Sequence, residues 1–162
     1  MSASSFSNII TETVIGGTAS YGGRVIRLVT GSTLLIGDVV FINATLNRAE
    51  KSTTNADYGK FLGVVVGGAS FASNGAICTD TTLVGQNAAV SGEFVMIQID
   101  GIAYIKSDGA ILAGSLVIPD ASIAGECDVA GANPGYTLGI ALQAAADGAV
   151  GKILIRQSYN EA

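Results

Sequence analysis

The chain has 162 residues and a mass of 16.2 kDa, with 8 basic and 13 acidic side chains and a formal net charge of −5. Histidine is absent, which excludes every mechanism that uses an imidazole as general base, proton shuttle or zinc ligand. The acidic balance argues against nucleic acids and anionic membranes as partners. Only 13% of the residues are charged, about half the usual share, so we expect an assembly to cover much of the surface.

Residues 1–23 are predicted to form an extended N-terminal arm. Serine and threonine alternate there with scattered apolar residues, two glycine pairs follow, and the first 20 residues carry one charge, Glu12. Five apolar side chains are the candidate contacts of this arm: Phe6, Ile9, Ile10, Val14 and Ile15. They are costly to leave in water, so we expect a partner to bury them, by strand addition to a sheet edge of another protein or of a neighbouring subunit.

The arm also bears on where the protein resides. It has neither a basic start nor a continuous apolar stretch, so no secretory signal is expected. The uncharged stretches 61–79 and 129–146 are interrupted by glycine and polar residues, which argues against membrane spans. We therefore expect a soluble protein.

Residues 24–162 are predicted to form a single all-β domain, a compact β-sandwich or barrel. Short β-branched runs separated by glycine are typical of these folds. The predicted strands are Arg24–Thr30, Val39–Asn43, Phe61–Val66, Phe94–Ile99, Ile102–Lys106, Leu116–Ile118, Thr137–Leu142 and Lys152–Gln157. Only Ala141–Ala146 offers a turn or two of helix.

The segment Asn43–Lys60 is the one charge-rich stretch of the chain. It is predicted to be a long exposed loop. Either it is solvated decoration, or it binds a partner, with Arg48 and Lys51 as the candidate contacts.

A weak internal repeat predicts two related halves. The run Leu34–Val40 resembles Ile111–Val117, and Gly59–Val65 resembles Gly135–Ala141, with offsets of 77 residues at Gly37/Gly114 and 76 at Gly63/Gly139. The alternative is that glycine-punctuated β proteins produce such matches by chance.

Asp100-Gly101 predicts a tight β-hairpin between Phe94–Ile99 and Ile102–Lys106, because this dipeptide favours the positive φ angles of a type I′ turn. The turn would place Ile99 opposite Ile102 and Ile97 opposite Tyr104. Both faces of such a pair are largely apolar, so one face is expected to pack on the domain core and the other on a second sheet or a neighbouring subunit.

The search for reactive groups finds no catalytic or cofactor site. No Ser/Lys, nucleophile-elbow, Walker or dinucleotide-binding motif occurs, so we expect neither an enzyme nor a bound cofactor. Glu126 and Asp128 are the best calcium candidates, but without a clustered acidic loop they are better interpreted as solvated carboxylates. Cys78 and Cys127 are expected to be reduced, buried small side chains rather than a disulfide.

Four runs in the second half carry a family resemblance: Gly92–Lys106, Ile111–Ile118, Tyr136–Leu142 and Gly148–Ile155, with residues 59–68 matching the corresponding strand of the first half. Their order resembles that of the capsid decoration, or cement, proteins of tailed bacteriophages. The pattern covers about the last two thirds of the chain. Related arrangements also occur in phage head fibres and tail spikes.

The resemblance implies a small β-rich subunit, a homotrimer, that binds the major capsid protein on the outer capsid surface and stabilises the shell. Residues 1–23 look like the N-terminal arms of this family by composition and position. The alternative is a head-fibre, tail-spike or receptor-binding β module. The chain has neither the repetitive shaft nor the coiled coil expected of a fibre.

Overall fold

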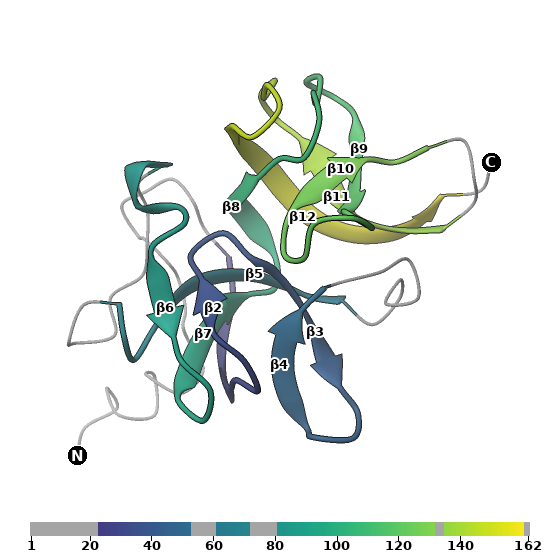
Figure 1. The fold of residues 1–162 in the computed structure, drawn as a ribbon. Coiled ribbons are helices and arrows are strands. Elements are labelled where there is room, and N and C mark those ends of the chain that lie inside the picture. The colour runs from purple at the N-terminus through teal and green to yellow at the C-terminus, as the bar shows by residue number, and fades with distance from the viewer. Residues whose placement is uncertain (1–22, 53–60, 72–80, 132–134, 161–162) are drawn as a thin grey trace, which may run out of the picture.

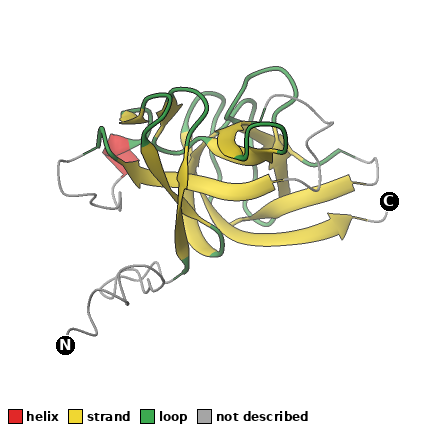
Figure 2. Cartoon of the chain, turned by 90° about the horizontal axis from the view of Figure 1, so that it is seen from below, coloured by secondary structure: helices red, strands yellow, loops and turns green. Residues whose placement is uncertain are grey.

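The computed structural model describes residues 23–52, 61–71, 81–131 and 135–160. The predicted arm, including its candidate contacts Phe6, Ile9, Ile10, Val14 and Ile15, therefore lies outside the described residues except for Gly23. The described part is almost entirely strand and turn, and its helical structure is limited to the 3-10 turn η2 (Thr81–Leu83) (Figure 2). The predicted all-β class is confirmed.

Two five-stranded antiparallel sheets and one small sheet make up the fold (Figure 1). The first sheet has the order β1 (Val25–Val29), β7 (Phe94–Gln98), β5 (Phe61–Gly68), β3 (Val39–Asn43) and β4 (Arg48–Lys51). The second has the order β10 (Cys127–Val129), β9 (Leu116–Pro119), β11 (Gly135–Ala141), β12 (Val150–Asn160) and β8 (Gly101–Lys106). A third sheet pairs β2 (Leu34–Leu35) with β6 (Asn87–Ala89).

The two large sheets share one topology, which confirms the predicted two halves. In the second sheet β8, β12, β11, β9 and β10 take the places that β1, β7, β5, β3 and β4 hold in the first. The agreement extends to single residues. Thr30 forms a parallel bridge to Ala49 and Ser107 forms one to Cys127, and each hydroxyl donates to the carbonyl two residues ahead, at 2.5 and 2.6 Å.

The repeat glycines are required by the backbone in both halves. Gly37 and Gly114 have φ angles of +91° and +87°, which L side chains rarely adopt. Gly63 and Gly139 face a different constraint. A Cβ at either position would lie far inside contact distance of a backbone carbonyl on the adjacent strand, Gln98 O or Leu154 O respectively.

The predicted hairpin between β7 and β8 is wrong. β7 lies between β1 and β5, so both of its edges are occupied, whereas β8 pairs with β12 in the other sheet. Asp100-Gly101 thus connects the two sheets. The positive φ of Gly101, +81°, is confirmed, but that of Asp100 is not positive, as a type I′ turn would need. The Gln98 side chain secures this crossing by donating to the carbonyls of Asp100 and Ile102, both at 2.8 Å.

The two sheets share a buried core, in a sandwich-like arrangement rather than a closed barrel. Val39, Phe61 and Val64 of the first sheet belong to the same cluster as residues of the second, among them Ile105 and Leu138. A second cluster lies within the first half and includes residues of β2 and β6. This burial supplies most of the stabilisation of the fold.

Two local predictions are corrected by longer-range pairing. Ala141–Ala146 is not helical, because Ala141 ends β11 and Ala145 forms an antiparallel bridge to Ile111. The segment Asn43–Lys60 is not one long loop, because Arg48–Lys51 forms β4 on β3 and both Ala49 and Ser52 are fully buried. Residues 53–60 lie outside the described ranges.

Candidate interaction surface

The two predicted basic contacts, Arg48 and Lys51, lie at opposite ends of β4 in the β3–β4 hairpin. Asn47, at a φ of +52°, closes the turn by donating its N–H to Asn43 O at 2.8 Å, and Asn43 Oδ1 accepts the N–H groups of the two residues that follow Ala44. Arg48 is exposed beside this turn, on the edge strand. Lys51, at the other end of β4, turns inward.

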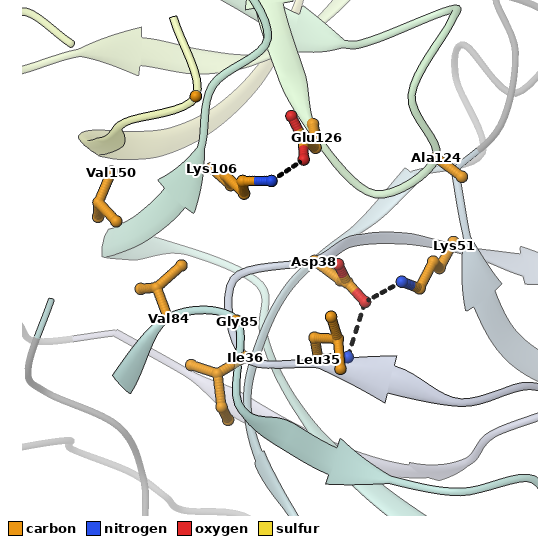
Figure 3. A pocket seen from close by; sticks show the side chains of 11 residues that line it. Leu35, Ile36, Asp38, Lys51, Val84, Gly85, Lys106, Ala124, Glu126 and Val150 are labelled. Carbon is orange, nitrogen blue, oxygen red and sulfur yellow. Dashed lines mark hydrogen bonds and ion pairs between the residues drawn. The ribbon is translucent and has the colours of Figure 1, made fainter. Parts of the chain in front are cut away.

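Lys51 lines a cavity of about 320 Å³ between the two halves (Figure 3). Two ion pairs lie in its wall: Lys51 Nζ is 3.1 Å from Asp38 Oδ2, and Lys106 Nζ is 2.5 Å from Glu126 Oε1. The remaining lining is Leu35, Ile36, Val84, Gly85, Ala124, Gly148 and Val150. Both cations of the cavity are therefore neutralised by the protein itself.

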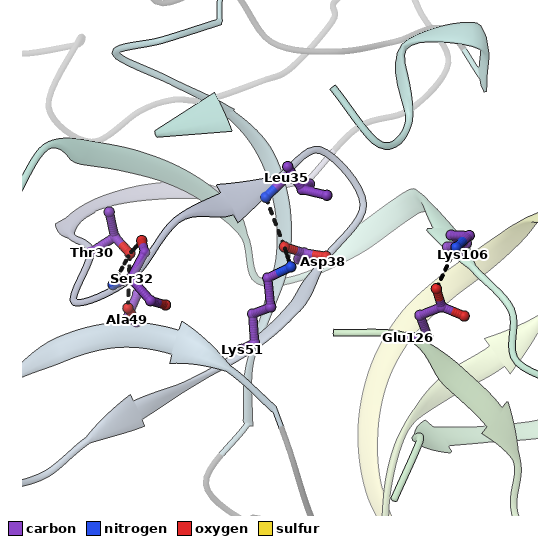
Figure 4. Close-up of polar contacts among 8 residues, drawn as sticks. All are labelled: Thr30, Ser32, Leu35, Asp38, Ala49, Lys51, Lys106 and Glu126. Atoms are coloured by element: carbon purple, nitrogen blue, oxygen red, sulfur yellow. Dashed lines mark hydrogen bonds and ion pairs between the residues drawn. The ribbon is translucent and has the colours of Figure 1, made fainter. Parts of the chain in front are cut away.

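Burial and pairing have opposite effects on the pKa of Asp38, and likewise on the pKa of Lys106. Figure 4 shows the contacts of both side chains. Burial raises the pKa of Asp38 above its ordinary value, and the Leu35 N–H and Lys51, which both donate to the carboxylate, offset only part of this effect. The hydrogen bond to Glu126 raises the pKa of Lys106. The position of Asp38 between the two sheets therefore destabilises its ionised form relative to the protonated form.

The loop before β10 fastens the second half to this region. Gly125 donates its N–H to Ser52 O at 2.9 Å and accepts the Val39 N–H at 2.8 Å. A Cβ at Gly125 would lie 2.6 Å from Asp38 Oδ1, so the loop packs directly on the carboxylate. The arrangement joins the two halves, and we assign Asp38, Lys51, Lys106 and Glu126 to that joint.

The two calcium candidates point to separate partners. Glu126 is paired with Lys106, and Asp128 Oδ1 accepts the Val129 N–H at 2.6 Å. Within the described ranges, no three acidic, cysteine or histidine side chains are grouped to hold a metal ion. Cys127 is a free thiol, fully buried, and burial raises its pKa well above the ordinary value. Cys78 lies outside the described residues.

Large apolar side chains are exposed over both halves. They share an exposed fraction of 37% or more, and they are Val29, Ile42, Leu46, Val90, Leu112, Ile123, Tyr136 and Leu142. Leu112 is the most exposed of them, at 70%. Charged contacts are fewer than these exposed apolar side chains, since three ion pairs join described residues to one another. Such a charge-poor surface is suited to burial against another protein.

The sequence prediction overlooked this set, because it looked for contacts in charged and N-terminal segments. One signal was available: the repeat aligns the exposed Leu112 with Leu35, which the first half partly buries. Asp100 and Gly101, the predicted turn residues, lie at the crossing between the sheets, where Asp100 pairs with Arg24 at 2.6 Å.

No protein-family model matches the chain, and no curated protein matches it. Among solved structures, it is similar to the N base of the head fibre protein gp8.5 of bacteriophage phi29, with a TM-score of 0.46 and 10% sequence identity. That match covers 85% of this chain and 98% of the other. No helix in the described part of this chain has the length and apolarity to cross a membrane.

Proposed function

We propose that this protein is a structural component of a bacteriophage particle, which binds the outer surface of the capsid as a homotrimer and stabilises the shell. The observation that carries the proposal is the surface, where eight large apolar side chains are exposed among the described residues, in a chain of which only 13% of the residues are charged. The order of the sequence motifs in its second half resembles that of decoration proteins, and this resemblance is the reason for proposing a capsid as the partner.

The major capsid protein is the proposed partner. Arg48 is available for a carboxylate of the shell, because it is exposed on the edge strand β4. Lys51 is not assigned to the shell contact, because it is paired with Asp38 in the joint. The apolar residues of the arm supply a further contact, by strand addition to an edge of the shell or of a neighbouring subunit.

Electron cryo-microscopy of the phage particles that encode this chain tests the location. Density for two five-stranded sheets on the outer capsid is the expected result. Density on the tail would favour a fibre or receptor-binding role instead, and absence of the chain from purified particles would overturn the proposal. Particles with and without the protein are then heated, and those that carry it should release their DNA at the higher temperature.

A further inference from the structure

The internal repeat allows one surface of the second half to be compared with its covered counterpart in the first. Turns 35–38 and 112–115 have the same hydrogen bonds. Gly37 donates its N–H to Val65 O at 2.9 Å, and Gly114 donates to Ala141 O at 2.8 Å. Because the backbones agree, any difference in exposure comes from what lies on top of each turn.

In the first half, residues 82–86 lie on the turn. Ile36 donates its N–H to Gln86 O and accepts the Gly85 N–H, both at 2.8 Å. The Val84 side chain covers Gly37, since its Cγ1 is 2.7 Å from the point where a Cβ of Gly37 would be. As a result Ile36 is only 3% exposed.

In the second half, the same turn is open. Leu112 is 70% exposed, Ala113 and Gly114 are exposed, and nothing lies within 4 Å of a Cβ built on Gly114. Ala113, the counterpart of Ile36, has no backbone hydrogen-bond partner among the residues that the structure describes. The turn thus presents a free N–H and C=O beside an exposed leucine, which is the combination that an added strand uses.

Chain length explains the difference. The bridge Leu34–Ala89 of the first half corresponds to Ile111–Ala145 of the second. The chain between Val65 and Ala89 includes the covering residues 82–86. The corresponding connection in the second half is much shorter, because only three residues separate Ala141 from Ala145. The second half therefore has no segment of its own at this point in the sequence to cover turn 112–114.

The sequence contains a second segment of the covering type. Residues 82–86 read Thr-Leu-Val-Gly-Gln, and residues 13–17 read Thr-Val-Ile-Gly-Gly. Threonine, two apolar side chains and a glycine recur in the same order. Gly85 has a φ of +92°, so glycine at the equivalent position 16 is the residue that this conformation requires.

We propose that Thr13–Gly17 of a neighbouring copy of the chain lies on turn 112–114, as residues 82–86 lie on turn 35–37. Ala113 would donate to Gly17 O and accept the Gly16 N–H, and Ile15 would cover Gly114. The inference rests on the oligomer in the proposed function, not on the capsid contact. A head-to-tail contact of this kind closes into a ring when the rotation between copies permits.

The tether favours a neighbour over the same copy. Gly23 is fixed beside Asp100, at the start of β8, and the six residues from Gly17 to Gly23 reach about 20 Å at most. From Ala103 in β8, the ladder crosses Ile153 and Ala141 to reach Gly114, about 14 Å across strands and, from Gly101, about 7 Å along β8. At right angles these two components combine to about 16 Å, so the copy's own segment would need about four fifths of its full reach, whereas a neighbour's segment does not have to span this distance.

Sedimentation equilibrium of the full-length chain tests the contact with matched variants. Gly16→Ala, which opposes the positive φ, and Leu112→Asp, which charges the edge, should each weaken association at least about tenfold. Gly17→Gln, which reproduces Gln86, and Leu46→Asp, which charges another exposed leucine on the β3–β4 hairpin, should leave it unchanged. Circular dichroism is the check that each of the four variants is folded.

A mixture of the two variants shows whether the segment comes from a neighbouring copy. Gly16→Ala impairs the segment 13–17 but keeps turn 112–114 intact, whereas Leu112→Asp impairs the turn and keeps the segment. An equimolar mixture should therefore associate more strongly than either variant alone. A monomeric wild-type protein, or association that neither variant weakens, would overturn the inference. If both variants accelerate hydrogen exchange at Ala113 without changing the mass, the copy's own segment is the occupant and the proposal of a neighbour is wrong. Normal association without capsid binding would instead refute only the proposed function.

Discussion

Replacing either repeat glycine, Gly63 or Gly139, with alanine should destabilise the protein strongly. The new Cβ would lie far inside contact distance of Gln98 O or Leu154 O, and that carbonyl must withdraw by at least about 1 Å to make room. Because it belongs to the adjacent strand, the shift disturbs about two ladder hydrogen bonds at roughly 1 kcal/mol each. Overpacking adds about 1–3 kcal/mol, so the expected loss is about 3–5 kcal/mol in the free energy of unfolding.

Thermal unfolding followed by circular dichroism measures the loss. A domain of this size loses about 2–4 °C in Tm per kcal/mol, so each variant should melt roughly 6–20 °C below the wild type. Gly131→Ala is the matched control, because nothing lies within 4 Å of a Cβ at Gly131 and its φ is not positive. If Gly63→Ala and Gly139→Ala melt within a degree of Gly131→Ala, the close strand approach is wrong, and so is the equivalence of the two halves at these positions.

Three other variants probe the crossing, the joint and the core. Gly101→Val should cost about 1–3 kcal/mol, measured by urea unfolding, because residue 101 has a φ of +81°. Asp38→Asn should remove a pH dependence: the raised pKa of Asp38 means that the folded protein holds this proton more tightly than the unfolded chain, so wild-type stability relative to the variant should fall as the pH rises from 3.8 through the raised pKa. Ile105→Ala, at a fully buried position, should cost about 2–5 kcal/mol by the same measurement.

Each of the three has its own refutation. The crossing between the sheets is misplaced if Gly101→Val unfolds at the urea concentration of Gly131→Val. A difference between wild type and Asp38→Asn that stays constant, or grows with pH, contradicts the burial of the carboxylate. The shared core is wrong if Ile105→Ala costs no more than Leu46→Ala, since Leu46 is 49% exposed.

The sequence was informative where local chemistry decides the structure. Eight predicted strands agree with β1, β3, β5, β7, β8, β9, β11 and β12 within a few residues, because β-branched runs between glycines have few alternatives. The spacing of Gly37 and Gly114 also pointed to the two halves, which the shared topology of the two sheets confirms. The short strands β2, β4, β6 and β10 were overlooked, because two to four residues are too few to show a period.

Strand pairing could not be predicted in the same way. Asp100-Gly101 has the composition of a hairpin turn, yet β7 and β8 pair with strands far away in the chain. Which partner wins depends on the burial available to the whole sheet, and this is not encoded in a dipeptide. The joint was overlooked for a related reason, since Asp38 and Gly125 are 87 residues apart and no motif links them.

The order of strands along the chain also has a consequence for synthesis on the ribosome. Every ladder of the first sheet joins residues between Val25 and Gln98, so that sheet is complete before the second is translated. At 5–20 residues per second, the rest takes about 3–13 s. During this interval Val39, Phe61 and Val64 lack the partners that the second half supplies. A pause in translation after Gln98 would prolong the exposure of this surface to chaperones and to other nascent chains.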